Sequence, residues 1–382
     1  MTERPLKLVY VTPALYMAGG VERVLTLKAN YFAEHFGYDI TIVLTEGKGK
    51  PLFYPLSEKI TVINLDIGFE ELWTCSFLKK IVVYLRKQRR FKRQLTAELM
   101  RLRPDITVSL LRREINFING IKDGSKKIGE LHVNRANYRN FRIEDAGMLK
   151  RLFAKFWSLS LLRHIRKLNK LVVLTEKDKE SWVELDNVVT IPDPLSFESA
   201  TVSPLSEKRV VAVARYSHEK GIDLLLQAWA EVEKNNSVWR LDVYGDGDRE
   251  PYERLIEQLR IDRGRCRLHG RTNDVEKEYH RSSLSVLSSR FEGFGMVIIE
   301  AMACGLPVVA FDCPWGPRSI IQDGVDGLLA ENGNVGVLAE KLTYMMAHPE
   351  ERQRMGMNAV RKAERYKIDR LANDWQQLFE SL

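Results

Sequence analysis

The sequence predicts an α/β protein of two doubly wound domains, and three observations support this prediction. Short β-branched runs alternate with stretches of helical length, which indicates βαβ units and a parallel sheet covered by helices on both faces. The alternation breaks over 191–208, where Pro, Ser and acidic residues accumulate, and then restarts. The chain has 382 residues, which at ~150 residues per domain favours two domains.

The predicted N-terminal domain covers 1–192. Its strands are short runs rich in Val, Ile, Leu and Thr, as expected for strands buried on both faces. We expect them at 6–12, 38–45, 60–65, 106–111, 127–132, 170–175 and 187–192. Helices are expected near 20–36, 76–103 and 146–168.

A predicted interdomain linker, 193–208, leads to a second domain over 209–365. Helices separate the strands of this domain, and three more follow Gly327. The strands are expected at 209–215, 239–245, 266–270, 284–289 and 307–312. Ligands bind beyond the carboxyl ends of such strands, so we expect the two domains to face a shared cleft that holds the site.

Composition narrows the class of protein. Hydrophobic residues make up 45% and charged residues 29% of the chain, which is typical of a globular protein and excludes a disordered one. No apolar run approaches the ~18 residues of a membrane span, and the start MTERPLKLVYVT does not resemble a secretory signal. The scattered cysteines lack metal or redox spacing, so a reduced cytoplasmic protein is expected. They are Cys75, Cys266, Cys304 and Cys313.

The positive charge belongs to the N-terminal half. Residues 1–200 contain 34 Lys and Arg against 23 Asp and Glu, a net charge of +11. Residues 201–382 contain 25 against 28, a net charge of −3, and the two halves sum to the total of +8. This asymmetry indicates that the first half faces an anionic partner, such as phospholipid, nucleic acid or a diphosphate substrate.

The segment 290–312 carries the most informative pattern. Gly293 and Gly295 stand between a predicted strand and a predicted helix, where glycine allows close backbone approach and the free N–H groups suit a diphosphate. Glu300 lies inside the apolar helix VIIEAMA, so it needs a hydrogen-bonding partner, and a ribose diol would serve. The alternative is a plain tight turn with Glu300 paired to an arginine. The presence of Glu292 in the same loop favours the ligand site.

A second cluster follows the strand 209–215. Arg215 ends this strand, and Lys220 precedes Gly221 and the next helix. Two cations at a strand-to-helix loop suit the oxygens of a diphosphate leaving group, where negative charge develops in the transition state. The alternative interpretation is that both cations are ordinary surface residues. The presence of Glu292 and Glu300 in the same domain disfavours this alternative.

Together these motifs resemble the retaining glycosyltransferases of family 4, the glycosyl transferases group 1 with the GT-B fold. The resemblance covers essentially the whole chain. It implies two Rossmann-like domains facing a cleft, with a final helix, 366–382, that packs back on the N-terminal domain. The matching motifs are a Glu-x7-Glu pair (Glu292 and Glu300), an Arg-x4-Lys pair (Arg215 and Lys220), EAMACGLPVVAFD (300–312), DGVDGLLAENGN (323–334) and GGVER (19–23).

The resemblance implies a role for each matching residue of the C-terminal domain. Glu300 would hold the ribose hydroxyls, and Arg215 and Lys220 the diphosphate of a nucleotide-sugar donor. Glu292 would be a catalytic residue beside the sugar hydroxyls and the reacting carbon. The other donor-binding positions are the backbone at Phe294, Gly295 and Met296, the base-framing Gly270 and Arg271, and Val275 beneath the base.

Two regions of the N-terminal domain match as well. Gly19 and Gly20 would bring backbone amides to the donor phosphates at a helix start. Glu22 lies in the first turn, where the helix dipole favours a carboxylate, and this local role explains it as well as a functional one. His132 matches the catalytic strand-end histidine of the family, near the primary hydroxyl of the sugar. A structural histidine is the alternative, because many relatives have Asp where this chain has Val133.

The implied reaction transfers a sugar from a nucleoside diphosphate with retention of configuration and without a metal or cofactor. Departure of the diphosphate creates an oxocarbenium-like centre, which charges around the leaving group stabilise. Glu292 is assigned electrostatic support and sugar positioning, and not covalent attack. The stretch YGDGD (244–248) is interpreted as a strand-end turn and not as a metal loop.

Two acid-free basic stretches indicate a membrane surface. Residues 77–93 contain eight Lys and Arg, and residues 146–170 contain seven, interleaved with Leu, Phe and Trp. Basic amphipathic helices of this kind bind anionic lipid, although a solvated face on an internal helix is the alternative. No nucleic-acid motif accompanies the charge, so nucleic acid is not expected as a partner.

The sequence therefore predicts a cytoplasmic glycosyltransferase, peripheral on the inner face of the plasma membrane. It would move a hexose or N-acetylhexosamine from a nucleoside diphosphate sugar, UDP favoured, to a lipid-linked or surface-glycan acceptor such as lipopolysaccharide. One alternative is a nucleotide-sugar 2-epimerase, which needs no acceptor. The other is a catalytically silent protein that binds lipid or nucleic acid.

Overall fold

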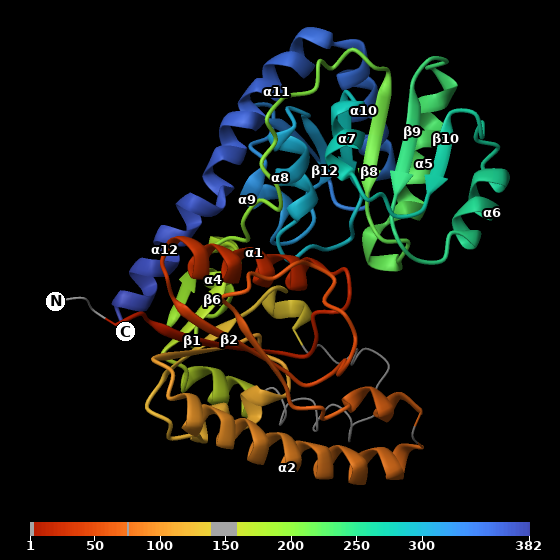
Figure 1. Cartoon of the computed structure of the whole chain (residues 1–382). Coiled ribbons are helices and arrows are strands. Elements are labelled where there is room, and N and C mark those ends of the chain that lie inside the picture. The colour runs from red at the N-terminus through yellow and green to blue at the C-terminus, as the bar shows by residue number, and fades with distance from the viewer. Residues whose placement is uncertain (1–3, 75, 139–158) are drawn as a thin grey trace. The chain divides into compact units, whose positions relative to one another are not determined.

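The computed structural model describes residues 4–74, 76–138 and 159–382 (Figure 1). The chain divides into two compact units, here called unit 1 (Met1–Pro194 and Ile368–Leu382) and unit 2 (Leu195–Lys367). Much of the second basic stretch lies outside the described residues, and its described part is helical at 159–166. Within the described ranges, no helix combines the length and the apolar character needed to cross a membrane.

Unit 1 is built on a parallel sheet with the order β3-β2-β1-β4-β5-β6-β7. Each strand falls inside a segment predicted from the β-branched runs or begins one residue before it. The strands are β1 (Lys7–Thr12), β2 (Asp39–Leu44), β3 (Thr61–Asn64), β4 (Ile106–Ser109), β5 (Lys126–Glu130), β6 (Lys170–Val173) and β7 (Val188–Thr190). The helices are α1 (Gly20–His35), α2 (Phe77–Leu102), α4 (Glu176–Ser181) and α12 (Ile368–Glu380), with 3-10 turns η1 (Phe69–Thr74), η2 (Glu114–Asn116), η3 (Ile118–Gly120) and η4 (Arg135–Asn137).

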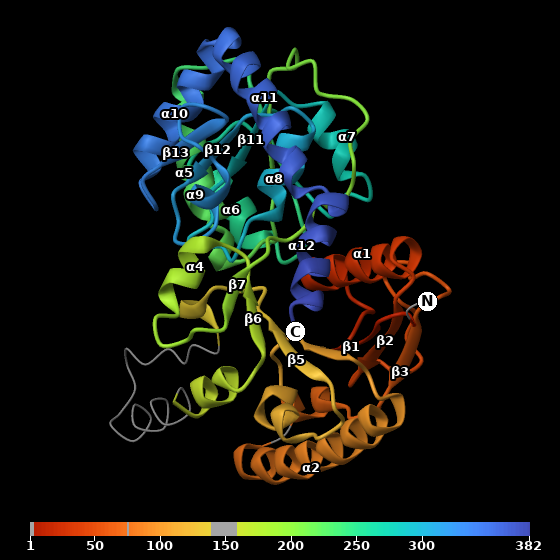
Figure 2. The ribbon, with the colours of Figure 1, turned by 90° about the vertical axis from the view of Figure 1, so that its left-hand side faces the viewer.

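Helices cover both faces of this sheet. Successive side chains of a strand point to opposite faces, and β1 shows the division clearly. Leu8 and Tyr10 pack in a core with α1 and α12, whereas Val9 and Val11 pack in a separate core with α2. Figure 2 shows α1 and α12 on one side of the sheet and α2 on the other. Burial on both faces explains why β1 is apolar on both sides from Leu8 to Val11.

The helix α12 completes the core of unit 1. Its apolar side chains recur at helical spacing, and Trp375 and Phe379 are buried with Phe32 of α1. The Nζ of Lys28, also on α1, lies 4.2 Å from the centroid of the Trp375 ring. The segment predicted to return to the N-terminal domain is therefore an integral part of unit 1.

Unit 2 contains a second parallel sheet with the order β10-β9-β8-β11-β12-β13. Its strands are β8 (Arg209–Val213), β9 (Arg240–Tyr244), β10 (Cys266–His269), β11 (Leu284–Leu287), β12 (Val308–Phe311) and β13 (Gly327–Ala330). Its helices are α5 (Ile222–Lys234), α6 (Glu250–Gln258), α7 (Val275–His280), α8 (Met296–Ala303), α9 (Pro317–Ile320), α10 (Val335–Ala347) and α11 (Pro349–Ala363), with 3-10 turns η5 (His218–Lys220) and η6 (Glu364–Tyr366).

The strand β13 was not predicted. It pairs in parallel with β12, from Val308 opposite Gly327 to Phe311 opposite Ala330. Its sequence GLLA is short and contains no β-branched residue, so its local preference for a strand is weak. The backbone hydrogen bonds to β12 therefore stabilise a strand that the local sequence only weakly favours.

The segment predicted as a linker belongs mostly to unit 2, which begins at Leu195. The backbone N–H of Ser203 donates to Cys304 O at 2.8 Å, and its hydroxyl donates to Ser282 O at 2.6 Å. These bonds satisfy polar groups of a segment without helix or strand. Unit 2 therefore starts 14 residues before the predicted boundary at residue 209 (209 − 195).

Candidate functional site

The loop after β11 carries the central carboxylate of the candidate site in unit 2. Glu292 is 8% exposed, and its Oε1 accepts hydrogen bonds from Lys220 Nζ and Ser289 Oγ, each at 2.6 Å. Lys220 ends η5, which follows β8, the strand next to β11 in the sheet. A buried carboxylate stays charged at low cost only when it is paired in this way. The structure thus joins two residues that the sequence placed in separate motifs.

Two further contacts hold these loops together. The Arg290 guanidinium donates to both carboxylate oxygens of Asp223, at 2.8 and 2.6 Å, and keeps the pKa of that carboxyl below its usual range. Gly221 has φ of 60°, and a Cβ there would overlap the carbonyl oxygen of Ser288. Only glycine allows the loops after β8 and β11 to approach this closely.

Arg215 lies on the same loop as Lys220 but faces solvent. Its Nη2 is 3.0 Å from Glu219 Oε1, and the side chain is exposed. A surface ion pair of this kind is weak. An incoming phosphate could therefore take the place of Glu219 with little loss.

The start of α8 lies beside Glu292. Gly295 caps this helix with φ of 105°, Met296 is its first residue, and Phe294 is buried just before it. Gly316, after β12, faces this turn: a Cβ there would lie 2.5 Å from Phe294 O and 2.7 Å from Glu292 Cβ. The first N–H groups of a helix lack partners within the helix, so this turn suits an anionic ligand.

Glu300 lies in the middle of α8 and is 3% exposed. Its Oε1 accepts a hydrogen bond from Ser196 Oγ at 2.6 Å. The apolar surroundings of this carboxylate predicted a hydrogen-bonding partner, and Ser196 provides one. The sequence did not single out Ser196, because 104 positions separate the two residues.

The predicted base-framing residues lie at the ends of β9 and β10. Arg271 pairs with Asp246, and the N–H of Gly245 donates to Gly270 O at 3.3 Å. Val275 begins α7 and is partly exposed. These three predicted residues share the strand edge that also carries Lys220 and Glu292, since parallel strands end at one edge.

The predicted glycines of unit 1 lie at the start of α1. Gly19 is the N-cap of this helix, and Gly20 is its first residue. The side chain of Glu22 folds back so closely that a Cβ at Gly19 would overlap its carboxylate. The carboxylate thus occupies the place where the helix dipole favours negative charge.

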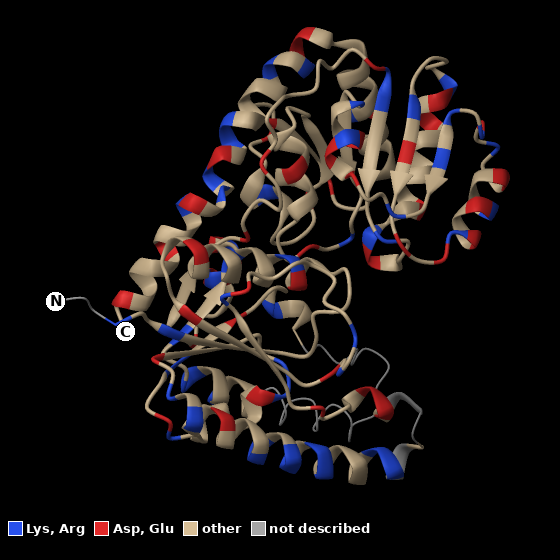
Figure 3. Ribbon diagram, in the orientation of Figure 1, with Lys and Arg blue, Asp and Glu red and all other residues tan. Residues whose placement is uncertain are grey.

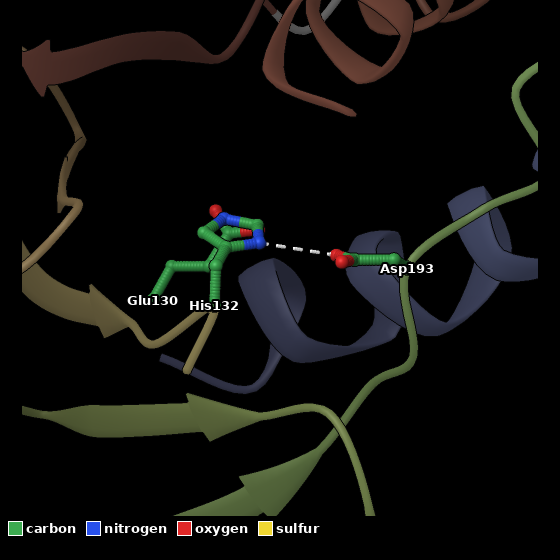
Figure 4. Close-up of side chains that lie close together, drawn as sticks. All are labelled: Glu130, His132 and Asp193. Atoms are coloured by element: carbon green, nitrogen blue, oxygen red, sulfur yellow. Dashed lines mark ion pairs between the residues drawn. The ribbon is translucent and has the colours of Figure 1, made fainter. Parts of the chain in front are cut away.

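His132 follows β5 in unit 1 and lies between two carboxylates (Figure 4). Its Nδ1 is 3.2 Å from Asp193 Oδ1, and its Nε2 is 3.2 Å from Glu130 Oε1. Glu130 also forms a buried ion pair with Lys28 of α1. Four ionisable side chains from three segments of unit 1 therefore meet here: α1, the end of β5 and the segment after β7.

The charges of this cluster support one another. Burial alone would lower the pKa of His132, but the carboxylates of Asp193 and Glu130 raise it to about 9. Burial alone would raise the pKa of Glu130, but the charges of Lys28 and His132 lower it to about 2. At neutral pH the ring is thus an imidazolium, which donates hydrogen bonds and does not accept a proton.

The same residues are the only group within the described ranges whose geometry could hold a metal ion. Ligand atoms of Glu130, His132 and Asp193 all lie within 4.8 Å of one another. However, the carboxylate of Asp193 faces Nδ1 of His132 and that of Glu130 faces Nε2. The Glu130 carboxylate is also already paired with the ammonium of Lys28. A metal ligand must be a neutral imidazole, so the arrangement fits an ion-pair network better than a metal centre.

Sequence reasoning named His132 but missed its partners. Glu130 stands two residues earlier, and this spacing at a strand end places both side chains on one face. Asp193 stands between two prolines just after β7, in the stretch that the sequence predicts as a linker. The spacing of Glu130 and His132 in the sequence is enough to predict their contact. The contact of Asp193 with His132 depends instead on the order of strands in the sheet.

Comparisons with solved structures define the fold as GT-B. The TarM variant from S. aureus, solved in complex with Fondaparinux, alpha-GlcNAc-glycerol and UDP, matches with a TM-score of 0.75 at 18% identity, over 98% of this chain and 99% of that one. Residues 197–362 match the family model described as glycosyl transferases group 1. That match covers all the predicted site residues of unit 2.

Two relatives extend the likeness beyond unit 2. An uncharacterized glycosyltransferase of Haemophilus influenzae is 27% identical over 365 residues, which are 94% of this chain and 96% of the relative. A poly(ribitol-phosphate) alpha-N-acetylglucosaminyltransferase of Staphylococcus aureus is 30% identical over 262 residues, which are 67% of this chain and 51% of the relative. The family match and these relatives identify the chain as a glycosyltransferase enzyme.

Proposed function

We propose that this enzyme is a retaining, metal-independent glycosyltransferase of family 4. It transfers a hexose or N-acetylhexosamine from a nucleoside diphosphate sugar to a lipid-linked or surface-glycan acceptor. The contact that carries the proposal joins Lys220 to Glu292, at 2.6 Å and next to the start of α8. This contact places a cation, a carboxylate and free helix amides at one edge of the unit 2 sheet, where parallel sheets bind ligands.

Each group has a role in the proposed reaction. Lys220 and Arg215 stabilise the negative charge of the departing diphosphate, and the amides at Gly295 and Met296 bind its oxygens. Glu300 binds the ribose hydroxyls. Glu292 orients the sugar and supports the positive charge of the oxocarbenium-like centre. Because Lys220 and Ser289 already engage its Oε1, a positioning role suits Glu292 better than covalent attack.

The relatives guide the choice of substrates. The matching S. aureus structure contains UDP, and the relative from Staphylococcus aureus is named for transfer of N-acetylglucosamine to poly(ribitol-phosphate). We therefore favour a UDP-sugar as donor and a glycan acceptor that carries phosphate or lipid. The positive charge of the first half suits the phosphate groups of such an acceptor.

The donor site predicts selective stabilisation by one nucleotide. At a hundredfold excess over its dissociation constant, UDP should add ~2.7 kcal/mol to the stability of unit 2. Glu300→Ala should abolish this gain, because the ribose loses its buried acceptor. A thermal-shift panel with UDP, GDP, ADP and CMP measures both effects.

The control for this panel is Glu340→Ala, an exposed glutamate on α10 of the same unit. It should keep the full shift with UDP. No shift with any nucleotide would contradict the proposed function. An equal shift in Glu300→Ala would remove Glu300 from the site.

We also propose that α2 attaches the enzyme to anionic membrane. Cations recur along α2, and no acid occurs in it before Glu98 (Figure 3). Its exposed residues include both cations and apolar side chains. Lys87, on the inward side, is buried and donates to Ile67 O at 2.7 Å. We call the exposed set the α2 outer face, and its members are Lys79, Lys80, Ile81, Val82, Leu85, Arg86, Arg89, Arg90, Lys92 and Arg93.

Neutralising part of the α2 outer face should weaken lipid binding. Each cation near an anionic surface contributes ~1 kcal/mol, so changing Arg89, Arg90 and Arg93 to Gln should cost about 100-fold in affinity. Co-sedimentation with phosphatidylserine vesicles measures this loss. The matched control changes exposed cations of unit 2 (Lys234, Arg254 and Arg263) to Gln and should bind as the wild type does. Equal binding of both triple variants would refute the membrane role.

A further inference from the structure

The partners of His132 lie in one corner of unit 1. Glu130 is the last residue of β5, and Asp193 follows β7, two strands away in the sheet. Both carboxylates are buried, with Glu130 1% and Asp193 6% exposed. Since neighbouring parallel strands end at the same edge, the strand order brings these carboxylates to opposite sides of one imidazole (Figure 4).

The backbone around Asp193 is restricted. Pro192 and Pro194 flank it, and a residue before proline is confined to extended conformations. The carboxylate therefore reaches Nδ1 of His132 with little loss of conformational entropy on folding. The same residue stands where the chain leaves unit 1, since unit 2 begins at Leu195.

Three buried polar atoms in this corner lack a hydrogen-bond partner among the described residues: His132 Nε2, Glu130 Oε2 and the Tyr10 hydroxyl. His132 Nε2 lies 3.2 Å from Glu130 Oε1 but without hydrogen-bond geometry. Buried polar atoms of native proteins are nearly always satisfied by protein, water or ligand. This corner therefore retains hydrogen-bonding capacity that its own side chains do not use.

We propose that Asp193 is a positioning residue: it binds Nδ1–H of His132 and thereby leaves Nε2–H as a donor to a hydroxyl group of the sugar. This inference rests on the proposed function. Glu130 acts from the other side and is itself fixed by Lys28. The two carboxylates that face the ring, from the end of β5 and from the segment after β7, then serve to keep one donor in place.

The electrostatics of the corner agree with a donor role. The pKa of His132 is raised to about 9, so the ring carries its second proton at neutral pH and loses it as the pH rises through that value. Burial and the negative charge of Glu130 raise the pKa of Tyr10, so this hydroxyl remains neutral. Because Nδ1–H is bound to Asp193, the proton lost is the one on Nε2. A reaction that needs this proton should therefore slow as the pH rises through the pKa of His132.

The test is Asp193→Asn, which keeps a side chain of similar size and removes the charge. The pKa of His132, followed by NMR of its ring protons, should fall, and the alkaline limb of the pH–kcat profile should move to lower pH. Above the new pKa we expect kcat to fall about 10-fold to 100-fold, the range for a lost charged hydrogen bond. UDP binding, which unit 2 supplies, should not change. His132→Asn identifies the His132 signal among the seven histidines.

The matched control is Asp123→Asn. Asp123 forms a buried ion pair with Lys127 at 2.6 Å in the same unit, so its loss reports general destabilisation. It should leave the His132 titration and the shape of the pH profile unchanged. An unchanged titration in Asp193→Asn, or a loss of kcat equal at every pH and shared with Asp123→Asn, would overturn the proposal. Wild-type protein that neither binds nucleotide nor transfers sugar would overturn the proposed function instead, and with it the donor role of His132.

Discussion

Replacing Lys220 with alanine should lower the rate of sugar transfer by about 10²-fold to 10³-fold, the usual effect of removing one group that stabilises transition-state charge. Lys220 is the cation in direct contact with Glu292, at 2.6 Å. Its charge matters most when the diphosphate departs, so kcat should fall more than donor affinity. Release of the nucleoside diphosphate, measured at saturating donor, gives this rate.

Lys234→Ala provides the matched control for this experiment. Lys234 is an exposed lysine at the end of α5, and it pairs only weakly along its own helix with Glu231. This variant should transfer sugar at the wild-type rate. A Lys220→Ala enzyme that retains a normal kcat would show that the diphosphate leaves without help from this loop.

Trp375→Ala should destabilise unit 1 by about 3–5 kcal/mol, the range for removing a large aromatic side chain from a core. Trp375 is 1% exposed, and its ring packs against Phe379 and lies beneath the ammonium of Lys28. Differential scanning calorimetry should show an earlier transition for unit 1. The UDP-dependent transition of unit 2 should stay in place, because Trp375 lies in the core of unit 1.

Met357→Ala is the control for the loss of a large apolar side chain. Met357 lies on α11 and is 55% exposed, so its removal leaves no cavity. This variant should melt within ~0.5 kcal/mol of the wild type, as is usual for surface substitutions. A Trp375→Ala protein with an unchanged profile would mean that α12 contributes little to the core of unit 1.

The sequence could predict the features that depend on neighbours in the chain. Among the described residues, alternating apolar runs and helical stretches located every strand except β13, since each run carries its own signal. The glycines around Phe294 predicted a turn before a helix, and Gly295 indeed has positive φ. The apolar neighbours of Glu300 predicted that this carboxylate has a buried partner.

Contacts between distant segments could not be predicted in the same way. Asp193 meets His132 only because β5, β6 and β7 lie side by side. A second example is Arg209, which binds Asp242 at 2.5 Å and Glu278 at 2.7 Å. No spacing rule links residues from two strands and a later helix, so these partners become visible only when the sheet is assembled.

The division of unit 1 between two parts of the chain has a consequence for biosynthesis. Synthesis proceeds from the N-terminus, and domains generally fold as units as they emerge from the ribosome. The helix α12 follows all of unit 2, yet Trp375 and Phe379 belong to the core of unit 1. Unit 2 can therefore reach its final fold during translation. Unit 1, although its strands are synthesised first, lacks α12 until the end of translation, so the sheet face that α12 covers stays exposed. A chaperone that shields apolar surface would act on unit 1 during this interval.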